Sequence, residues 1–356
     1  MKPPSHPVAS GDRRVARALG AALARAGHTV EVPSVFRARD GKGDPDRQAR
    51  LAALGDKLAR RLVRRYRAKG SAPDLWFTYH LHYKAPDHLG PRVARDLAIP
   101  YVVAETSVAM KRAGGPWARG HESTLAALRA ADAVVSLNPA DDAGVNPHVR
   151  QSCKRLALGP FLDPTPYARA RAPREPGPVR LLAVGMMRDG DKTESYRVLA
   201  DALARLESRD WRLSIAGDGP ARREIESLFV PFGPRVEFLG LRDEEMLIGD
   251  YARADIFVWP SVNEAFGMAL LEAQASALPA VAGDFGGVAS ILEDGTTGYL
   301  ARPRDAGDFA AKLDRLIADL DLRARMGTAA RAKVASRHSL DGAARRLNEL
   351  LAELAP

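Results

Sequence analysis

The chain has 356 residues and is 46% hydrophobic and 27% charged, which is typical of a globular protein with room for two domains. Its formal net charge is +9, and its single cysteine, Cys153, excludes an internal disulfide and indicates a reducing compartment. No apolar run is long enough to span a bilayer and no signal peptide precedes the first expected helix, so we expect a cytoplasmic protein, with peripheral contact at the inner membrane face left open.

The first half of the chain alternates helices and strands, the pattern of a parallel α/β sheet. Three prolines within residues 1–7 leave no room for the strand with which a doubly wound domain normally begins. We therefore hypothesise that the recorded start lies several residues too late. The expected elements are a helix from Ser10-Gly11-Asp12 to residue 26, a strand at 28–32, a helix at 47–69, a strand at 74–79, a helix at 91–97, and strands at 101–104 and 133–137.

The long helix of this half is strongly basic. The segment Lys57–Lys69 is dense in arginine, while Leu54, Leu58, Leu62 and Tyr66 form an apolar stripe along the same helix. Such a helix is either a solvated surface helix or a docking face for anionic lipid. No nucleic-acid-binding motif accompanies the charge, so we expect no nucleic-acid partner.

A segment rich in proline and arginine, residues 161–178, separates the two halves and predicts a linker. We expect a first domain at 1–160, a second domain at 179–338 and a last helix within 339–356. The elements expected in the second half are strands at 179–184, 212–216, 236–239, 256–259 and 280–282, and helices at 194–206, 221–229, 243–252, 267–277 and 340–354.

Glu264 and Glu272 form an E-x7-E pattern between an apolar strand and a buried helix. Glu264 is expected on the loop at the carboxyl end of the strand, where open α/β sheets bind ligands. The free N–H groups of Phe266, Gly267 and Met268 at the helix start suit a diphosphate. Glu272 can accept two hydrogen bonds from a sugar diol, so the segment predicts a nucleotide-sugar site.

Two further loops follow strands of the same predicted sheet. Gly185 allows a tight turn before Arg188 and Lys192, which are either solvated charges or cations that neutralise a leaving diphosphate. Gly217 and Asp218 begin another strand-to-helix turn, over which the donor can pass.

Candidate acceptor-side residues lie in the first half. His80 and His82 follow the strand at 74–79. No third potential metal ligand lies at a recognisable spacing from them, so we expect no metal site there. Gly11, Arg13 and Arg14 open the first helix, either as part of a simple cap or as a loop that meets an anionic acceptor or the donor phosphate.

Taken together, these motifs resemble family 4 (group 1) glycosyltransferases of the GT-B fold. The resemblance implies two Rossmann-like doubly wound parallel-sheet domains facing a central cleft, with the last helix packing back on the first domain. It implies a nucleotide-sugar donor in the second domain, an acceptor in the first, and retaining transfer without a metal or other cofactor. The motifs that carry it are Gly185 with Arg188 and Lys192, residues 217–220, 254–261, the E-x7-E segment, Gly286-Gly287 and residues 294–300.

By position, the resemblance assigns Arg188 and Lys192 to the diphosphate, Glu272 to the ribose, and Glu264 with the amides after it to the sugar and phosphate. Two features depart from the family pattern. Thr106 stands where a histidine is frequent, so an acceptor-side histidine must be His80 or His82. Residues 289–290 are Ala-Ser instead of the usual Pro-Glu, which leaves the donor sugar open.

We therefore expect a retaining glycosyltransferase that uses a carbohydrate or lipid-linked acceptor in cell-surface polysaccharide or glycolipid synthesis. The alternatives are a nucleotide-sugar epimerase or phosphorylase on the same fold, or an inactive nucleotide-sugar-binding module. An NAD dehydrogenase fits poorly, because no G-x-G-x-x-G motif follows a first strand.

Overall fold

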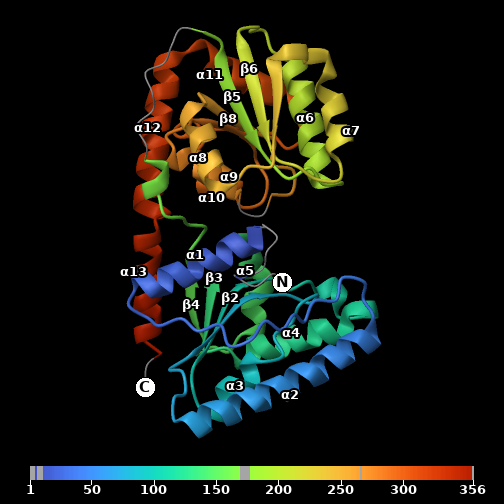
Figure 1. Cartoon of the computed structure of the whole chain (residues 1–356), viewed down its shortest axis with the longest axis vertical. Coiled ribbons are helices and arrows are strands. Elements are labelled where there is room, and N and C mark those ends of the chain that lie inside the picture. The colour runs from blue at the N-terminus through green and yellow to red at the C-terminus, as the bar shows by residue number, and fades with distance from the viewer. Residues whose placement is uncertain (1–4, 6–10, 169–176, 265–266, 355–356) are drawn as a thin grey trace. The chain divides into compact units, whose positions relative to one another are not determined.

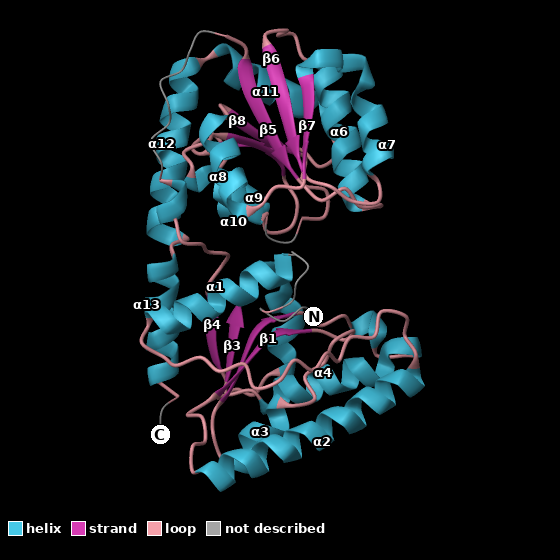
Figure 2. Cartoon of the chain, in the orientation of Figure 1, coloured by secondary structure: helices cyan, strands magenta, loops and turns pink. Residues whose placement is uncertain are grey.

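The computed structural model describes residues 5, 11–168, 177–264 and 267–354 (Figure 1). The chain divides into two compact units. The first is Met1–Pro160 together with Leu340–Pro356, and the second is Phe161–Ser339. Both are α/β units, with helices and strands alternating along most of the chain (Figure 2).

The described residues of the first unit form a parallel sheet of four strands in the order β1-β2-β3-β4. All three neighbouring strand pairs are parallel. The strands are β1 (Trp76–Leu81), β2 (Tyr101–Thr106), β3 (Ala133–Ser136) and β4 (Lys154–Ala157), and the helices are α1 (Gly11–Arg25), α2 (Pro45–Lys69), α3 (Gly90–Leu97), α4 (Ala118–Ala130), α5 (Asp142–Val145) and α13 (Leu340–Ala352).

Two features of this sheet differ from the sequence predictions. Residues 28–32 form no strand, and Val30 and Val32 are exposed. Their alternation resembles a strand, but a strand also needs a neighbour for its backbone groups, and no described strand pairs with them. The structure adds β4 at the sheet edge, where exposed Lys154 and Arg155 hide the strand from an apolar-run search.

Helix α2 has clear ends. Asp44 caps its first turn by accepting from the N–H groups of Asp46 and Arg47 at 3.0 Å each, and Pro45 is its first residue. Gly70 ends it in the left-handed region at φ 60°. Its buried face includes Leu62 and Tyr66, which pack in the cluster that also contains residues of α3.

The second unit has a parallel sheet of six strands in the order β10-β9-β8-β5-β6-β7. The chain builds outward from β5 in one direction and then returns to build outward from β8 in the other. The neighbours β5 and β8 therefore form a topological switch point, where ligands bind beyond the carboxyl ends of the strands. The strands are β5 (Val179–Val184), β6 (Trp211–Ala216), β7 (Val236–Gly240), β8 (Ile256–Trp259), β9 (Ala280–Gly283) and β10 (Gly298–Ala301).

Helices flank this sheet on both sides (Figure 2), and β8 contacts both α6 and α9. All four residues of β8 are buried, as expected for a central parallel strand. The helices are α6 (Asp191–Arg205), α7 (Arg222–Phe229), α8 (Glu244–Arg253), α9 (Met268–Ala275), α10 (Val288–Ile291), α11 (Ala306–Ala318) and α12 (Leu320–Arg337).

Part of the expected linker belongs to the second unit. Leu162 and Tyr167 are buried in its core because they find apolar partners there, and the Leu162 N–H donates to the carbonyl of His338 at 3.0 Å. Residues 169–176 of the linker lie outside the described part of the chain. Within the described part, no helix is both long and apolar enough to cross a membrane.

Candidate functional site

The carboxyl ends of β5 and β8 bring together two residues that lie far apart in the sequence. Lys192, in the first turn of α6, forms an ion pair with Glu264, on the loop after β8. The indole N–H of Trp259 donates to the same carboxylate oxygen of Glu264 at 3.3 Å. The Lys192 amine also lies 5.3 Å from the centre of the Trp259 ring. The side chains of Lys192 and Glu264 remain 31% and 21% exposed, so a ligand can reach both.

The loop after β8 is tied to α6 by further hydrogen bonds. Asn263 donates to Asp191 at 2.8 Å, and the Val262 N–H donates to the Ser195 hydroxyl at 3.0 Å. Ser261 and Asn263 have positive φ values of 56° and 50°. Such conformations are costly for residues other than glycine, and they recur at ligand-binding loops.

Arg188 lies at the same switch point, on the loop after β5. Its side chain is exposed and forms no ion pair with any residue that the structure describes. Its exposed guanidinium, which has no ion-pair partner among the described residues, gives this edge of the sheet a cationic group that is available to an anion.

The glycines near this loop have a structural explanation. A Cβ on Gly217 would lie 1.8 Å from the Gly185 carbonyl oxygen, and one on Gly185 would lie 2.6 Å from the Trp259 ring. The turns after β5 and β6 therefore pack directly on each other. Asp218 accepts from the Gly219 N–H at 2.7 Å and from Arg222 at 3.3 Å, so it stabilises its own turn. The predicted donor contacts of Gly185, Gly217 and Asp218 stay predictions.

The start of α9 also faces the site. Gly267 precedes the helix with φ 66°, and Met268 is its first residue. The first N–H groups of a helix have no acceptor within it, so they are available to an anion. Phe266, predicted to be part of this anion site, lies outside the described residues.

Glu272 is a buried member of the predicted donor-binding set. It is 3% exposed, and the Tyr251 hydroxyl donates to its Oε2 at 2.9 Å. This bond joins α9 to α8, so Glu272 has a structural role whether or not it also holds a ribose.

On the first unit, the structure joins His80 to a residue that the sequence analysis missed. The Nδ1 of His80 lies 3.5 Å from Oε1 of Glu105, and the two side chains are 17% and 15% exposed. Both residues have positive φ, 65° and 52°, although neither is glycine. The signal in the sequence that could have identified Glu105 is its position directly after the apolar run of β2.

His82 lies beside this pair, with its ring centre 6.1 Å from that of His80. Burial, followed by the positive charges of His80, Lys84 and Arg39, lowers the pKa of His82 to about 4, so the ring is neutral near pH 7. The other predicted acceptor residues lie on a different element. Gly11 is the first residue of α1, and Arg13 and Arg14 are half-buried in its first turn.

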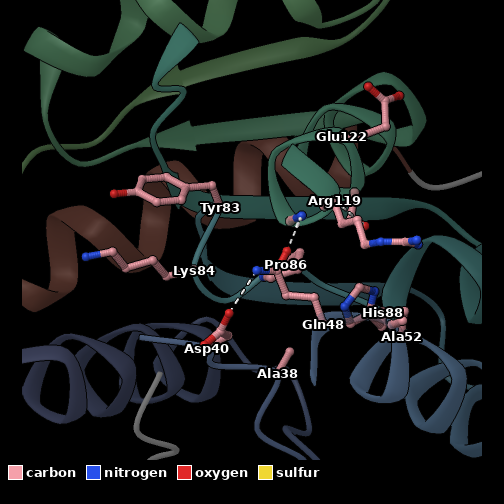
Figure 3. Close-up of a pocket in the computed structure, with 13 residues that line it drawn as sticks. Ala38, Asp40, Gln48, Ala52, Tyr83, Lys84, Pro86, His88, Arg119 and Glu122 are labelled. Atoms are coloured by element: carbon pink, nitrogen blue, oxygen red, sulfur yellow. Dashed lines mark hydrogen bonds between the residues drawn. The ribbon is translucent and has the colours of Figure 1, made fainter. Parts of the chain in front are cut away.

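Tyr83 and Lys84, which follow His82 in the chain, line a small cavity of 280 Å³ (Figure 3). The loop after β1, the start of α2 and the start of α4 line it. Gln48 stabilises one wall of this cavity. Its side-chain amide nitrogen donates to Asp40 at 2.8 Å, and its side-chain oxygen accepts from the Gly120 N–H at 3.1 Å.

Residues 178–319 match the family model described as glycosyl transferases group 1. The chain is 39% identical over 123 residues to a sulfoquinovosyl transferase from Arabidopsis thaliana. This match covers 34% of this chain and 24% of that protein. It is 34% identical over 208 residues to a D-inositol 3-phosphate glycosyltransferase from Corynebacterium jeikeium, which covers 55% of this chain and 49% of that protein. The matches thus span half or less of these relatives.

Two solved structures resemble the whole chain in fold. Sucrose-phosphate synthase from Thermosynechococcus elongatus has a TM-score of 0.70 at 22% identity, covering 97% of this chain and 94% of that one. HepE from Anabaena in complex with UDP and glucose has a TM-score of 0.64 at 17% identity, covering 85% and 82%. The parallel sheets of both units and these likenesses confirm the expected fold class, two parallel-sheet α/β domains of the GT-B type, and residues 178–319 match the group 1 glycosyltransferases.

Proposed function

We propose that the chain transfers a sugar from a nucleoside-diphosphate sugar to a hydroxyl of a carbohydrate or lipid-linked acceptor, with retention of anomeric configuration. The observation that carries the proposal is the Lys192–Glu264 pair at the switch point of the second unit, with exposed Arg188 on the loop after β5. The relatives named as glycosyltransferases support the reaction class, and the UDP bound to HepE supports a nucleotide-sugar donor.

In the proposed complex, Arg188, Lys192 and the first N–H groups of α9 bind the diphosphate. When the bond between sugar and phosphate breaks, the leaving diphosphate gains negative charge. The two cations stabilise that charge more in the transition state than in the ground state, which lowers the barrier.

Retention requires either a covalent sugar intermediate or attack from the face that the diphosphate leaves. A covalent intermediate needs a nucleophile, and the carboxylate of Glu264 is the candidate at this site. One of its oxygens, however, already accepts hydrogen bonds from Lys192 and Trp259. Hydrogen bonds of this kind stabilise the carboxylate and reduce its nucleophilicity. We therefore favour same-face attack, with a leaving phosphate oxygen taking the proton of the acceptor hydroxyl. No metal or further cofactor enters this scheme.

The acceptor is assigned to the first unit, at the carboxyl ends of β1 and β2. The imidazole of His80, with Glu105 beside it, can orient an acceptor hydroxyl by hydrogen bonding. The proposed role is in cell-surface polysaccharide or glycolipid synthesis, and the names of the sulfoquinovosyl transferase and the D-inositol 3-phosphate glycosyltransferase support the sugar transfer that such a role needs.

Peripheral membrane contact remains part of the proposal in a narrower form. Leu62 and Tyr66, two residues of the apolar stripe of α2, are buried within the first unit. This part of the stripe therefore cannot enter a bilayer. The exposed cations Lys57, Arg61 and Arg64 can still attract anionic lipid.

A thermal-shift screen against UDP, GDP and ADP tests the donor site. A nucleotide that binds the native state raises the melting temperature, and we expect the rise to shrink in Arg188→Ala. No rise with any nucleoside diphosphate would overturn the donor proposal. A rise without sugar transfer to any acceptor would favour the inactive binding module, and turnover without an acceptor hydroxyl would favour an epimerase or phosphorylase.

A further inference from the structure

Two basic side chains gather around two aromatic rings at the carboxyl edge of the first sheet, and a third lies on a neighbouring segment. Lys84 lies on the loop after β1, and Arg112 lies on the 3-10 turn Met110–Arg112 after β2. Arg39 lies on a segment tied to the first loop, because the Asp40 N–H donates to the Lys84 carbonyl at 2.8 Å. Segments distant in sequence thus meet at one edge.

Tyr83 and Trp117 hold two of these cations side by side. The rings meet edge to face with centres 5.9 Å apart. The Lys84 amine lies 5.7 Å and 5.6 Å from the ring centres of Tyr83 and Trp117, and the Arg112 guanidinium carbon lies 5.6 Å and 4.8 Å from the same two. Attraction to the ring faces offsets part of the repulsion between the like charges.

No carboxylate of the described chain neutralises this group. Arg39, Lys84 and Arg112 form no ion pair with a described residue, and the Nε of Arg112 is buried without a hydrogen-bond partner among them. Basic residues nearby behave differently: Arg92 pairs with Asp56 at 2.7 Å. The carboxylate of Asp40 accepts from Gln48 and from backbone N–H groups, while Lys84 and Tyr83 extend away from it (Figure 3).

His82 completes the group as a neutral donor. Its Nδ1 accepts from the Lys84 N–H at 3.4 Å, which leaves Nε2 to carry the proton. Burial lowers the pKa of His82 most, and the positive charges of His80, Lys84 and Arg39 lower the pKa further.

We propose that Lys84, Arg112 and Arg39, with His82, form a subsite for a phosphate ester carried by the acceptor. Separate cationic donors that approach from different segments match the several oxygens of a phosphate better than the two of a carboxylate. His80 and His82 are neighbours, so an acceptor with its phosphate here presents a hydroxyl to His80 and Glu105. The inference rests on the proposed function at one point only, the statement that the acceptor carries the phosphate.

The test uses glycerol 3-phosphate, with glycerol as the uncharged control, titrated into the full-length protein while imidazole resonances are followed by NMR. Saturating nucleoside diphosphate is present so that the donor site does not contribute. We expect the resonance that His82→Gln removes to shift with glycerol 3-phosphate and not with glycerol. In Lys84→Gln/Arg112→Gln the dissociation constant is expected to rise by about tenfold or more.

A matched control variant removes the same number of positive charges from a different part of the surface. Lys57→Gln/Arg61→Gln removes two exposed cations from α2 and is expected to bind the ester as the wild type does. Equal affinity in wild type, control and Lys84/Arg112 variant overturns the subsite. Because the phosphate probe is read without sugar transfer, its binding is measured even if the proposed reaction fails. A retained nucleotide-induced rise in melting temperature shows that a loss of ester binding is not unfolding.

The phosphate has two possible sources, and vesicles distinguish them. Binding to phosphatidylcholine vesicles that contain phosphatidylglycerol, lost in Lys84→Gln/Arg112→Gln and kept in the α2 control, assigns the subsite to a lipid headgroup. Binding of the free ester with no such vesicle binding assigns it to a soluble sugar or polyol phosphate. Vesicle binding lost only in the α2 control, with no binding of the free ester, overturns the proposal.

Discussion

Lys192 and Glu264 are 72 residues apart in sequence, and their contact fixes two loops of the second unit relative to each other. The pair also sets the chemistry available there. Glu264 orients the amine of Lys192, and the diphosphate that we propose would compete with Glu264 for the same cation. Because Lys192 has both a structural contact and a proposed catalytic role, activity and stability must be measured together.

Lys192→Ala is expected to lower kcat by roughly 10²–10³-fold, because it removes a charge that acts most strongly in the transition state. Its effect on stability is expected to be small, since the side chain is about one-third exposed. Steady-state turnover and thermal melting on the same preparations check this. Lys57→Ala is the control for loss of one exposed lysine, and wild-type turnover in Lys192→Ala would remove the proposed role.

Glu105→Gln keeps the shape of the side chain and removes the charge beside His80. We expect the KM for the acceptor to rise roughly tenfold, as the negative charge beside His80 is lost, while the affinity for the nucleotide stays the same. Kinetics with varied acceptor and a nucleotide thermal shift separate the two effects. A rise in the nucleotide dissociation constant instead would place Glu105 outside acceptor binding.

At the scale of elements, the second unit depends on two strand-to-helix turns that touch. Gly217 has φ 148°, and its Cα lies so close to the Gly185 carbonyl that no side chain fits between them. The glycines that first indicate a ligand loop are therefore required by packing alone. Their presence supports the fold more directly than it supports a donor contact.

Gly217→Ala is expected to destabilise the second unit by roughly 2–4 kcal/mol, because it combines backbone strain with a steric clash. Gly249→Ala in α8 is the matched control. The nearest atom to its new Cβ is the flexible end of Arg253 at 3.3 Å, so we expect a gain of about 0.5–1 kcal/mol from helix propensity. Urea unfolding of both variants measures the difference, and equal stabilities would contradict the packing argument.

Strands with a long apolar run were predictable from the sequence, including the edge strands β1 and β7, whereas the short edge strand β4 was not. The apolar run of β8 predicts a central strand, which the structure contains. The short edge strand β4 carries exposed charges, and residues 28–32 have a strand pattern without a described partner strand. In the candidate site, Lys192 and Glu264 were found because each follows an apolar strand. The partnership of Glu105 with His80 was missed, because only the sheet order makes β1 and β2 neighbours.

At the scale of the whole molecule, the first unit is built from two separate pieces of the chain. Helix α13 packs against α1 and β4, and Arg25 forms an ion pair with Asp341 at 2.8 Å. The apolar face of α13, which includes Leu347, Leu350 and Leu351, is buried. The last residues of the chain therefore contribute to the core of the first unit and not to the second.

A chain that ends at Ser339 is expected to lose stability in the first unit, because the surface that α13 covers becomes exposed to water. Nucleotide binding by the second unit is expected to persist. Calorimetry with and without a nucleoside diphosphate checks both statements. One shared transition, with the nucleotide response lost, would show that the two units do not fold independently.

The split first unit also has a consequence for synthesis on the ribosome. The residues up to Pro160 emerge first, but the helix that completes their core is the last to be made. At roughly 5–20 residues per second, translation of the intervening second unit takes on the order of ten to forty seconds. During that time the apolar face of α1 that α13 covers stays exposed in the nascent first unit, so we expect chaperones to bind there. The second unit is a continuous segment and can fold as soon as it leaves the exit tunnel.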